Sequence, residues 1–183
     1  EAMRGFDVFM RFAKALVRVR PDVHFLVVGE ERTYYGNDSK HIRARSFKQH
    51  VLEHVTGEVP QVHFLGRLPR EELRAVLSLS DLHVYLTVPF VLSWSLLDAM
   101  ACECAVLASD TAPVLEVLDD PSLGERVPFG DVDAMVGAAV ALLEDEPRRR
   151  AMGEAARERV VSRYDTDVVY PAFRALLDSA LSS

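Results

Sequence analysis

Short apolar runs that end in glycine recur along this chain, and helical patterns separate them. Residues 23–28 form the first run, ended by Gly29, and residues 62–65 form another, ended by Gly66. Such runs are typical of strands buried on both faces of a parallel sheet. Strands that alternate with helices predict a doubly wound α/β domain, a Rossmann-like arrangement with helices on both faces of the sheet. Further strands are expected at residues 82–87, 104–108 and 126–129.

Apolar residues at helical spacing mark the segments between these runs. A first helix from about Phe6 should end at Pro21, because proline cannot continue a helix. The end of the chain reads as helical, with Asp131 as a cap and Pro147 in a first turn. Other helices are expected at about residues 47–55, after Pro69, and at residues 93–101, 111–118 and 166–180, whereas residues 30–39 are expected to form a loop.

Length and composition indicate one soluble domain, residues 1–183. Hydrophobic residues make up 49% and charged residues 27%, and the net charge of −7 offers no basic field for nucleic acid. No apolar run approaches the roughly 18–20 residues that span a bilayer, and no signal peptide is visible. Cys102 and Cys104 are too close for a disulfide framework or a four-ligand zinc site, which predicts reduced thiols in a cytoplasmic protein.

One carboxylate, Asp98, lies in an otherwise uncharged run that follows a strand and a proline turn. Ligands of such sheets bind beyond the carboxyl ends of the strands, where a helix expected to begin near Ser93 would offer its first amides to an anion. Asp98 would lie one turn further on, on the same face as Trp94 and Ser95. A carboxylate there suits the vicinal hydroxyls of a ribose. An internal cap or salt bridge is the alternative role for Asp98.

Several segments, in this order, resemble the family-4 retaining glycosyltransferases. They are LGRL at 65–68, ELRAVLSLSDLHVYL at 72–86, SLLDAMACECAVLASD at 95–110, EVL at 116–118 and VPFGDVDAM at 127–135. The resemblance covers nearly the whole chain and falls on the donor-binding, C-terminal half of the two-domain GT-B fold. It implies transfer of a sugar from a nucleoside-diphosphate sugar to an acceptor with retention, without a metal or other cofactor. Polysaccharide biosynthesis is the implied setting.

The resemblance also implies roles for individual residues. Of two glutamates in the family pattern, the second falls on Asp98 and implies ribose binding. The first falls on Phe90, which cannot accept a hydrogen bond, beside the transferred sugar. Ser93 stands where the family usually has glycine. The implied phosphate-binding residues are Arg4, Ser93, Trp94 and Ser95, the base-binding residues are Arg67 and Leu68, and the sugar-proximal residues are Phe90, Val91 and Leu92.

The family pattern extends beyond the start of this chain. Its phosphate clamp pairs an arginine with a lysine, and Arg4 lies at the lysine position. The partner arginine, the central strand that carries it and the acceptor-binding N-terminal domain would precede Glu1. Residues 165–183 would cross back to that domain, with Pro171 supplying a kink. The resemblance therefore implies a fragment that binds donor weakly and transfers nothing alone, from an enzyme with possible peripheral membrane association.

Other interpretations stay open at this point. A non-catalytic nucleotide-sugar sensor or assembly module fits the departure of both Phe90 and Asp98 from glutamate. An unrelated Rossmann-type enzyme is disfavoured, because no G-x-G-x-x-G follows a strand. His50 and His54 fit the H-x-x-E-H pattern of zinc peptidases, but no third ligand is evident, so no metal site is expected. A solvated surface charge is the alternative role for Arg4, and for Arg67 it is the more usual one, because a lone arginine in a loop commonly faces solvent.

Overall fold

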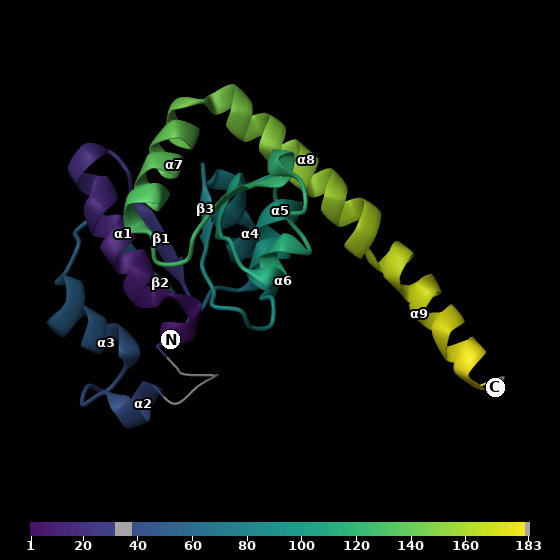
Figure 1. Cartoon of the computed structure of the whole chain (residues 1–183), viewed down its shortest axis with the longest axis horizontal. Helices are drawn as coiled ribbons and strands as arrows, with labels where there is room; N and C mark the ends of the chain where they lie inside the picture. The colour runs from purple at the N-terminus through teal and green to yellow at the C-terminus, as the bar shows by residue number, and fades with distance from the viewer. Residues whose placement is uncertain (32–37, 182–183) are drawn as a thin grey trace.

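The protein is an α/β domain with parallel strands in two sheets (Figure 1). The computed structural model describes residues 1–31 and 38–181. One sheet pairs β1 with β2, and the other has the order β3-β4-β5. This arrangement confirms the predicted doubly wound class. The strands are β1 (Phe25–Val28), β2 (Val62–Gly66), β3 (His83–Tyr85), β4 (Val106–Ser109) and β5 (Glu125–Val127).

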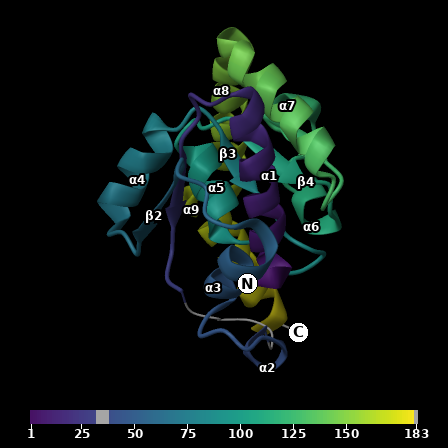
Figure 2. The ribbon, with the colours of Figure 1, turned by 90° about the vertical axis from the view of Figure 1, so that its left-hand side faces the viewer.

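Helices cover both faces of the strands, as Figure 2 shows from the side. The side chains of β4 alternate between two cores, as the period of a strand requires. Leu107 packs in the core that holds α1 and α7, whereas Val106 and Ala108 pack in the core that holds α5 and α8. The helices are α1 (Phe6–Val19), α4 (Arg70–Leu79), α5 (Trp94–Ala101), α7 (Val132–Glu144) and α8 (Glu146–Tyr164).

Local structure departs from the sequence prediction in the connections. The helix expected at residues 47–55 is a short α-helix, α3 (Phe47–Val51), followed by a π-helical turn (Leu52–Thr56). The expected loop at residues 30–39 ends in a helical turn, α2 (Asp38–His41), and its residues 32–37 lie outside the described residues. The shorter elements are 3-10 turns at Ala2–Arg4 and Pro121–Leu123 and the helix α6 (Ala112–Leu115).

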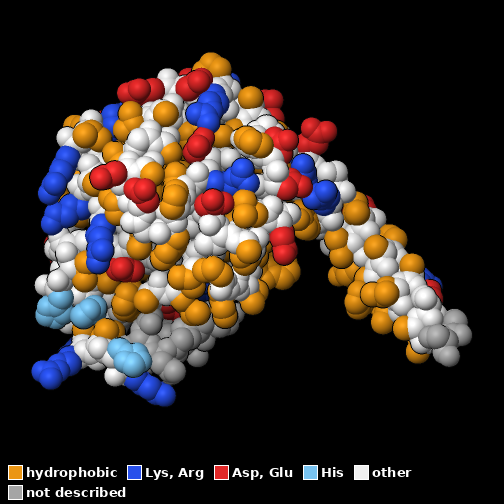
Figure 3. Space-filling view, in the orientation of Figure 1, with side chains coloured by type: hydrophobic (Ala, Val, Ile, Leu, Met, Phe, Trp, Pro, Cys, Tyr) orange, Lys and Arg blue, Asp and Glu red, His pale blue; other side chains and the backbone are white. Residues whose placement is uncertain are grey.

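The last helix, α9 (Thr166–Leu181), projects away from the body of the domain (Figure 1). None of its described residues is buried, although Figure 3 shows hydrophobic side chains along it. Phe173 is 57% exposed and Leu176 is 66% exposed. Pro171 lies inside the helix, at the position where the sequence predicts a kink. The described helices include no candidate transmembrane span.

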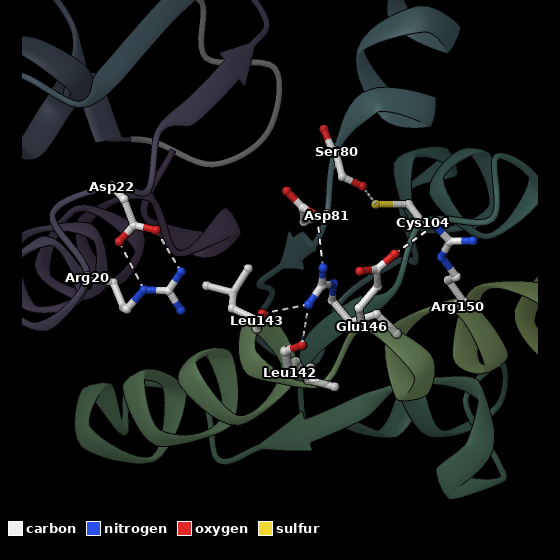
Figure 4. Close-up of polar contacts among 10 residues, drawn as sticks. Arg20, Asp22, Ser80, Asp81, Cys104, Leu142, Leu143, Glu146 and Arg150 are labelled. Atoms are coloured by element: carbon white, nitrogen blue, oxygen red, sulfur yellow. Dashed lines mark hydrogen bonds and ion pairs between the residues drawn. The ribbon is translucent and has the colours of Figure 1, made fainter.

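A cleft of about 1260 Å³ separates the two sheets. Across the described strands, β1 pairs only with β2 and β3 pairs only with β4, so the facing edges of β1 and β3 line the cleft without pairing to each other. Phe9, Phe12 and Leu16 of α1 also line it. At the amino end, Arg20, Asp22 and Asp81 line the cleft, and the Asp81 carboxylate lies 3.1 Å from the Arg149 guanidinium. Figure 4 shows the Arg20–Asp22 ion pair and Asp81.

The imidazole of His83, on β3 at this cleft, should make stability depend on pH. Its Nε2 is buried and has no hydrogen-bond partner among the described residues, and desolvation lowers its pKa from 6.5 to about 4. A depressed histidine pKa gives stability that is complete above pH 6.5 and falls as the pH drops towards 4. At pH 5 we expect a loss of about 2 kcal/mol in unfolding free energy, measured by urea denaturation. His83→Leu should remove this dependence of the unfolding free energy on pH, whereas the control His41→Leu, at an exposed site, should keep it. If His83→Leu keeps the same pH dependence, His83 is not its cause.

Candidate functional site

The carboxyl end of the cleft gathers most of the predicted phosphate and ribose ligands. Arg4, Ser93, Ser95 and Asp98 all line it, although Arg4 lies far from the other three in the sequence. Arg67 lines the same cleft from the loop after β2. The predicted residues that do not line it are Leu68, Phe90, Val91, Leu92 and Trp94.

The start of α5 presents a capped helix end at this cleft. The Ser93 hydroxyl accepts a hydrogen bond from the Ser95 amide at 3.4 Å, which is a long cap contact. The Ser93 amide donates to the hydroxyl of buried Tyr85 at 2.7 Å. Trp94 is the first residue of α5, so its amide precedes the hydrogen-bond ladder of the helix. Phosphate binding here stays a prediction, and a phosphate on the Ser93 amide would compete with Tyr85.

Asp98 lies one turn into α5 and is partly buried. Its carboxylate forms no hydrogen bond or ion pair with any residue in the described parts of the chain, which distinguishes it from a cap or a salt-bridge residue. Asp98 lines the main cleft and also a second groove of about 780 Å³ between α4, α5 and α8. The Asp98 carboxylate, where the cleft and the groove meet, is therefore accessible to a ligand hydroxyl.

Backbone geometry brings Arg4 to the mouth of the cleft. Gly5 has φ +65° and directly precedes α1. Its amide donates a hydrogen bond to the Ala2 carbonyl at 2.8 Å, which closes the turn that contains Arg4. This left-handed conformation favours glycine. The Arg4 guanidinium donates to the Val91 carbonyl at 3.2 Å and lies 5.7 Å from the centre of the Phe90 ring. Arg4 therefore contacts the segment that leads into α5.

The opposite wall carries the predicted Arg67 and three charged residues that the sequence reasoning missed, Glu30, Glu31 and Lys48. The Arg67 guanidinium, on a side chain 81% exposed, lies 3.6 Å from the Glu30 carboxylate. The Lys48 ammonium lies 3.9 Å from the centre of the Phe64 ring and pairs with Glu31, whose pKa this contact lowers. No motif in the sequence signals Lys48, because its neighbours in α3 show only helical periodicity. Its place at the cleft follows from tertiary packing.

The sequence also offered a histidine pair as a candidate metal site, with His50 in α3 and His54 in the π-helical turn that follows. The rings of His50 and His54 lie 5.2 Å apart, and His54 is 3.8 Å from the Glu53 carboxylate. Over residues 1–31 and 38–181, no group of three His, Cys, Asp or Glu residues is placed to hold a metal ion. The expectation that donor binding needs no metal stays a prediction.

Comparisons with known proteins find relatives in sequence and in fold. A phosphatidyl-myo-inositol mannosyltransferase of Mycolicibacterium smegmatis is 30% identical over 173 residues, which cover 92% of this chain and 40% of that protein. The structure of Anabaena HepE in complex with UDP-glucose has a TM-score of 0.79 at 18% identity, covering 98% of this chain and 46% of that one. The C-terminal domain of LpcC, a glycosyl transferase group 1 family protein of Francisella tularensis, has a TM-score of 0.73 at 22% identity. That match covers 91% of this chain and 82% of the LpcC domain.

The shares covered show that this chain spans less than half the length of the mannosyltransferase it matches. The two solved structures, at these identities, establish the fold alone. The family model for glycosyl transferases group 1 matches residues 1–159. The chain therefore belongs to the glycosyl transferases group 1 family.

Proposed function

We propose that this chain is the donor-binding domain of a retaining glycosyltransferase that uses a nucleoside-diphosphate sugar. The observation that carries the proposal is the meeting of Arg4, the start of α5 and Asp98 in one cleft at the carboxyl edge of the strands. A helix start and a guanidinium suit a diphosphate, and a carboxylate without a partner among the described residues suits a ribose. The UDP-glucose complex of Anabaena HepE supports a donor of this class.

In the proposed reaction the bond between the anomeric carbon and the diphosphate oxygen breaks, and the sugar passes to an acceptor oxygen. Negative charge then grows on the departing diphosphate. Arg4 and the first amides of α5 would stabilise that charge as preorganised donors. Asp98 would hold the ribose, the main chain of Leu68 would contact the base with Arg67 alongside, and residues 90–92 would lie near the sugar.

Acceptor binding and closure would come from other parts of a longer protein. We propose that a strand preceding α1 pairs with the facing edges of β1 and β3 and leaves the carboxyl end of the cleft open to the donor. We also propose that the exposed apolar side chains of α9 pack against an acceptor domain. The domain alone would then bind donor weakly and transfer nothing, because closure that excludes water would be missing. The partial coverage of the mannosyltransferase supports this two-domain arrangement.

Calorimetry of this chain with UDP, GDP and ADP tests the proposal. We expect one of them to bind preferentially, and its free nucleoside, which lacks the diphosphate, to bind at least tenfold more weakly, since each bond to a charged oxygen is worth about 1.5–3 kcal/mol. The single tryptophan, Trp94, lies at the start of α5 and gives a fluorescence readout of the same titration. Absence of binding by all three nucleotides, or equal binding of the nucleoside, would refute it.

A non-catalytic nucleotide-sugar module is the second candidate. Phe90 favours it, because residues 88–92 carry no hydrogen-bonding side chain beside the proposed sugar position. The two functions separate in a transfer assay of the full-length protein with and without Phe90→Glu. An enzyme forms product with Phe90 in place, whereas a sensor binds the nucleotide sugar and leaves it intact.

A further inference from the structure

We infer that Phe90 is a positioning residue that orients the Arg4 guanidinium at the mouth of the cleft. The inference rests on the proposed function for the identity of the ligand, a diphosphate. Its geometric basis is independent of that function, because it consists of contacts within the protein. Phe90 would act through Arg4 and would not touch the reacting atoms.

Two contacts from adjacent residues fix Arg4. The centre of the Phe90 ring lies 5.7 Å from the guanidinium carbon, within the range of a cation–π interaction. The Val91 carbonyl accepts a hydrogen bond from Arg4 Nη1 at 3.2 Å. The carbonyl holds one end of the guanidinium and the ring lies against it, so together they restrict a long side chain that would otherwise sample many rotamers.

The segment that carries Phe90 is itself anchored at both ends. The Val88 amide donates to the Met3 carbonyl at 3.1 Å, and the Ser93 amide donates to the Tyr85 hydroxyl at 2.7 Å. Phe90 is therefore presented from a short span tied on one side to the turn that contains Arg4 and on the other to the core.

The turn that carries Arg4 is equally constrained. A Cβ at Gly5 would come within 2.9 Å of Leu86 Cβ and of the Phe129 ring, so this turn is packed against the end of β3. Two constrained segments, 87 residues apart in the sequence, thus meet through Arg4 and its contacts with residues 90 and 91. If Phe90 only filled space, replacing it would affect nucleotide binding equally with and without Arg4. If Phe90 orients the guanidinium, its replacement affects binding only when Arg4 is present.

A double-mutant cycle with Phe90→Leu and Arg4→Met tests the inference, with UDP, GDP and ADP as ligands in calorimetry. Phe90→Leu should weaken the preferred nucleotide about two- to fivefold, the loss expected for an exposed cation–π contact. Phe90→Trp should restore the affinity. In the Arg4→Met background Phe90→Leu should have no further effect. Equal losses in both backgrounds, or no loss in either, would overturn the inference.

Nuclear magnetic resonance of the free protein supplies a readout that needs no nucleotide. The Arg4 Nε–Hε resonance should show an upfield ring-current shift that Phe90→Leu abolishes and that Phe173→Leu, the same change on exposed α9, leaves intact. An Arg4 resonance that is unaffected by Phe90→Leu would refute the stacking whatever the ligand. If the shift is lost as expected but no nucleotide binds, the proposed function fails and the positioning of Arg4 stands.

Discussion

Asp98→Ala should weaken binding of the preferred nucleoside diphosphate about tenfold to a hundredfold in calorimetry. The loss reflects hydrogen bonds from ribose hydroxyls to a charged acceptor, worth about 1.5–3 kcal/mol. The fold should tolerate the change, since the Asp98 carboxylate has no partner in the described structure, and the melting temperature should move by no more than a few degrees. Glu116→Ala, at an exposed carboxylate close to α6, is the matched control and should bind as the wild type does.

A modified ligand assigns that loss to the ribose. A 2′,3′-dideoxynucleoside diphosphate should bind the wild type as weakly as the normal nucleotide binds Asp98→Ala. The Asp98→Ala variant should bind the dideoxy nucleotide and the normal nucleotide equally well, because the carboxylate that distinguishes these two ligands is gone. If Asp98→Ala still discriminates between the two ligands as the wild type does, Asp98 does not contact the ribose.

Gly153→Ala should give the largest loss of stability. Gly153 lies in α8 where the helix meets the turn after α5, and an added Cβ would fall 2.0 Å from the Glu103 carbonyl oxygen and 2.8 Å from its carbon. These are backbone atoms of a residue already at φ +59°, so they cannot rotate away as a side chain would. We expect a loss in unfolding free energy at or above the upper end of about 1–3 kcal/mol, measured by urea denaturation.

Gly137→Ala is the matched control for this change. Gly137 lies on an exposed position of α7, and beyond its chain neighbours and the backbone of its own helix no atom of the described residues lies within 4 Å of an added Cβ. Alanine there should stabilise the protein by about 0.5–1 kcal/mol through helix propensity. If Gly153→Ala also stabilised the protein, Gly153 would not be needed for the close approach of α8 to Glu103.

The strand and helix pattern was predictable because it depends on local periodicity. Apolar runs ended by Gly29 and Gly66 are followed by loops at one edge of the sheet, as expected of parallel strands. The short run before Ser109 is buried along its whole length, as a central strand should be. Strand ends shifted by up to two residues, since periodicity does not encode where pairing stops. The π-helical turn after Val51 had no sequence signal.

Contacts between distant segments could not be read from the sequence. Family resemblance placed Arg4 and Asp98 at one ligand, but it gave no reason to pair Arg4 with Phe90 or the Ser93 amide with Tyr85. Lys48 reaches the cleft through packing of α3 that no motif records. Such contacts arise when helices cross over a sheet, and they depend on the tertiary arrangement rather than on spacing along the chain.

The most direct test of the account is a backbone amide NMR titration of the domain with its preferred nucleoside diphosphate. The account predicts the largest shifts at Trp94 and Ser95, with a second set around Asp98, because the phosphates would lie at the start of α5 and the ribose one turn further. Shifts confined to the groove between α4 and α8, around Arg70 and Arg157, with the start of α5 unmoved, would contradict it.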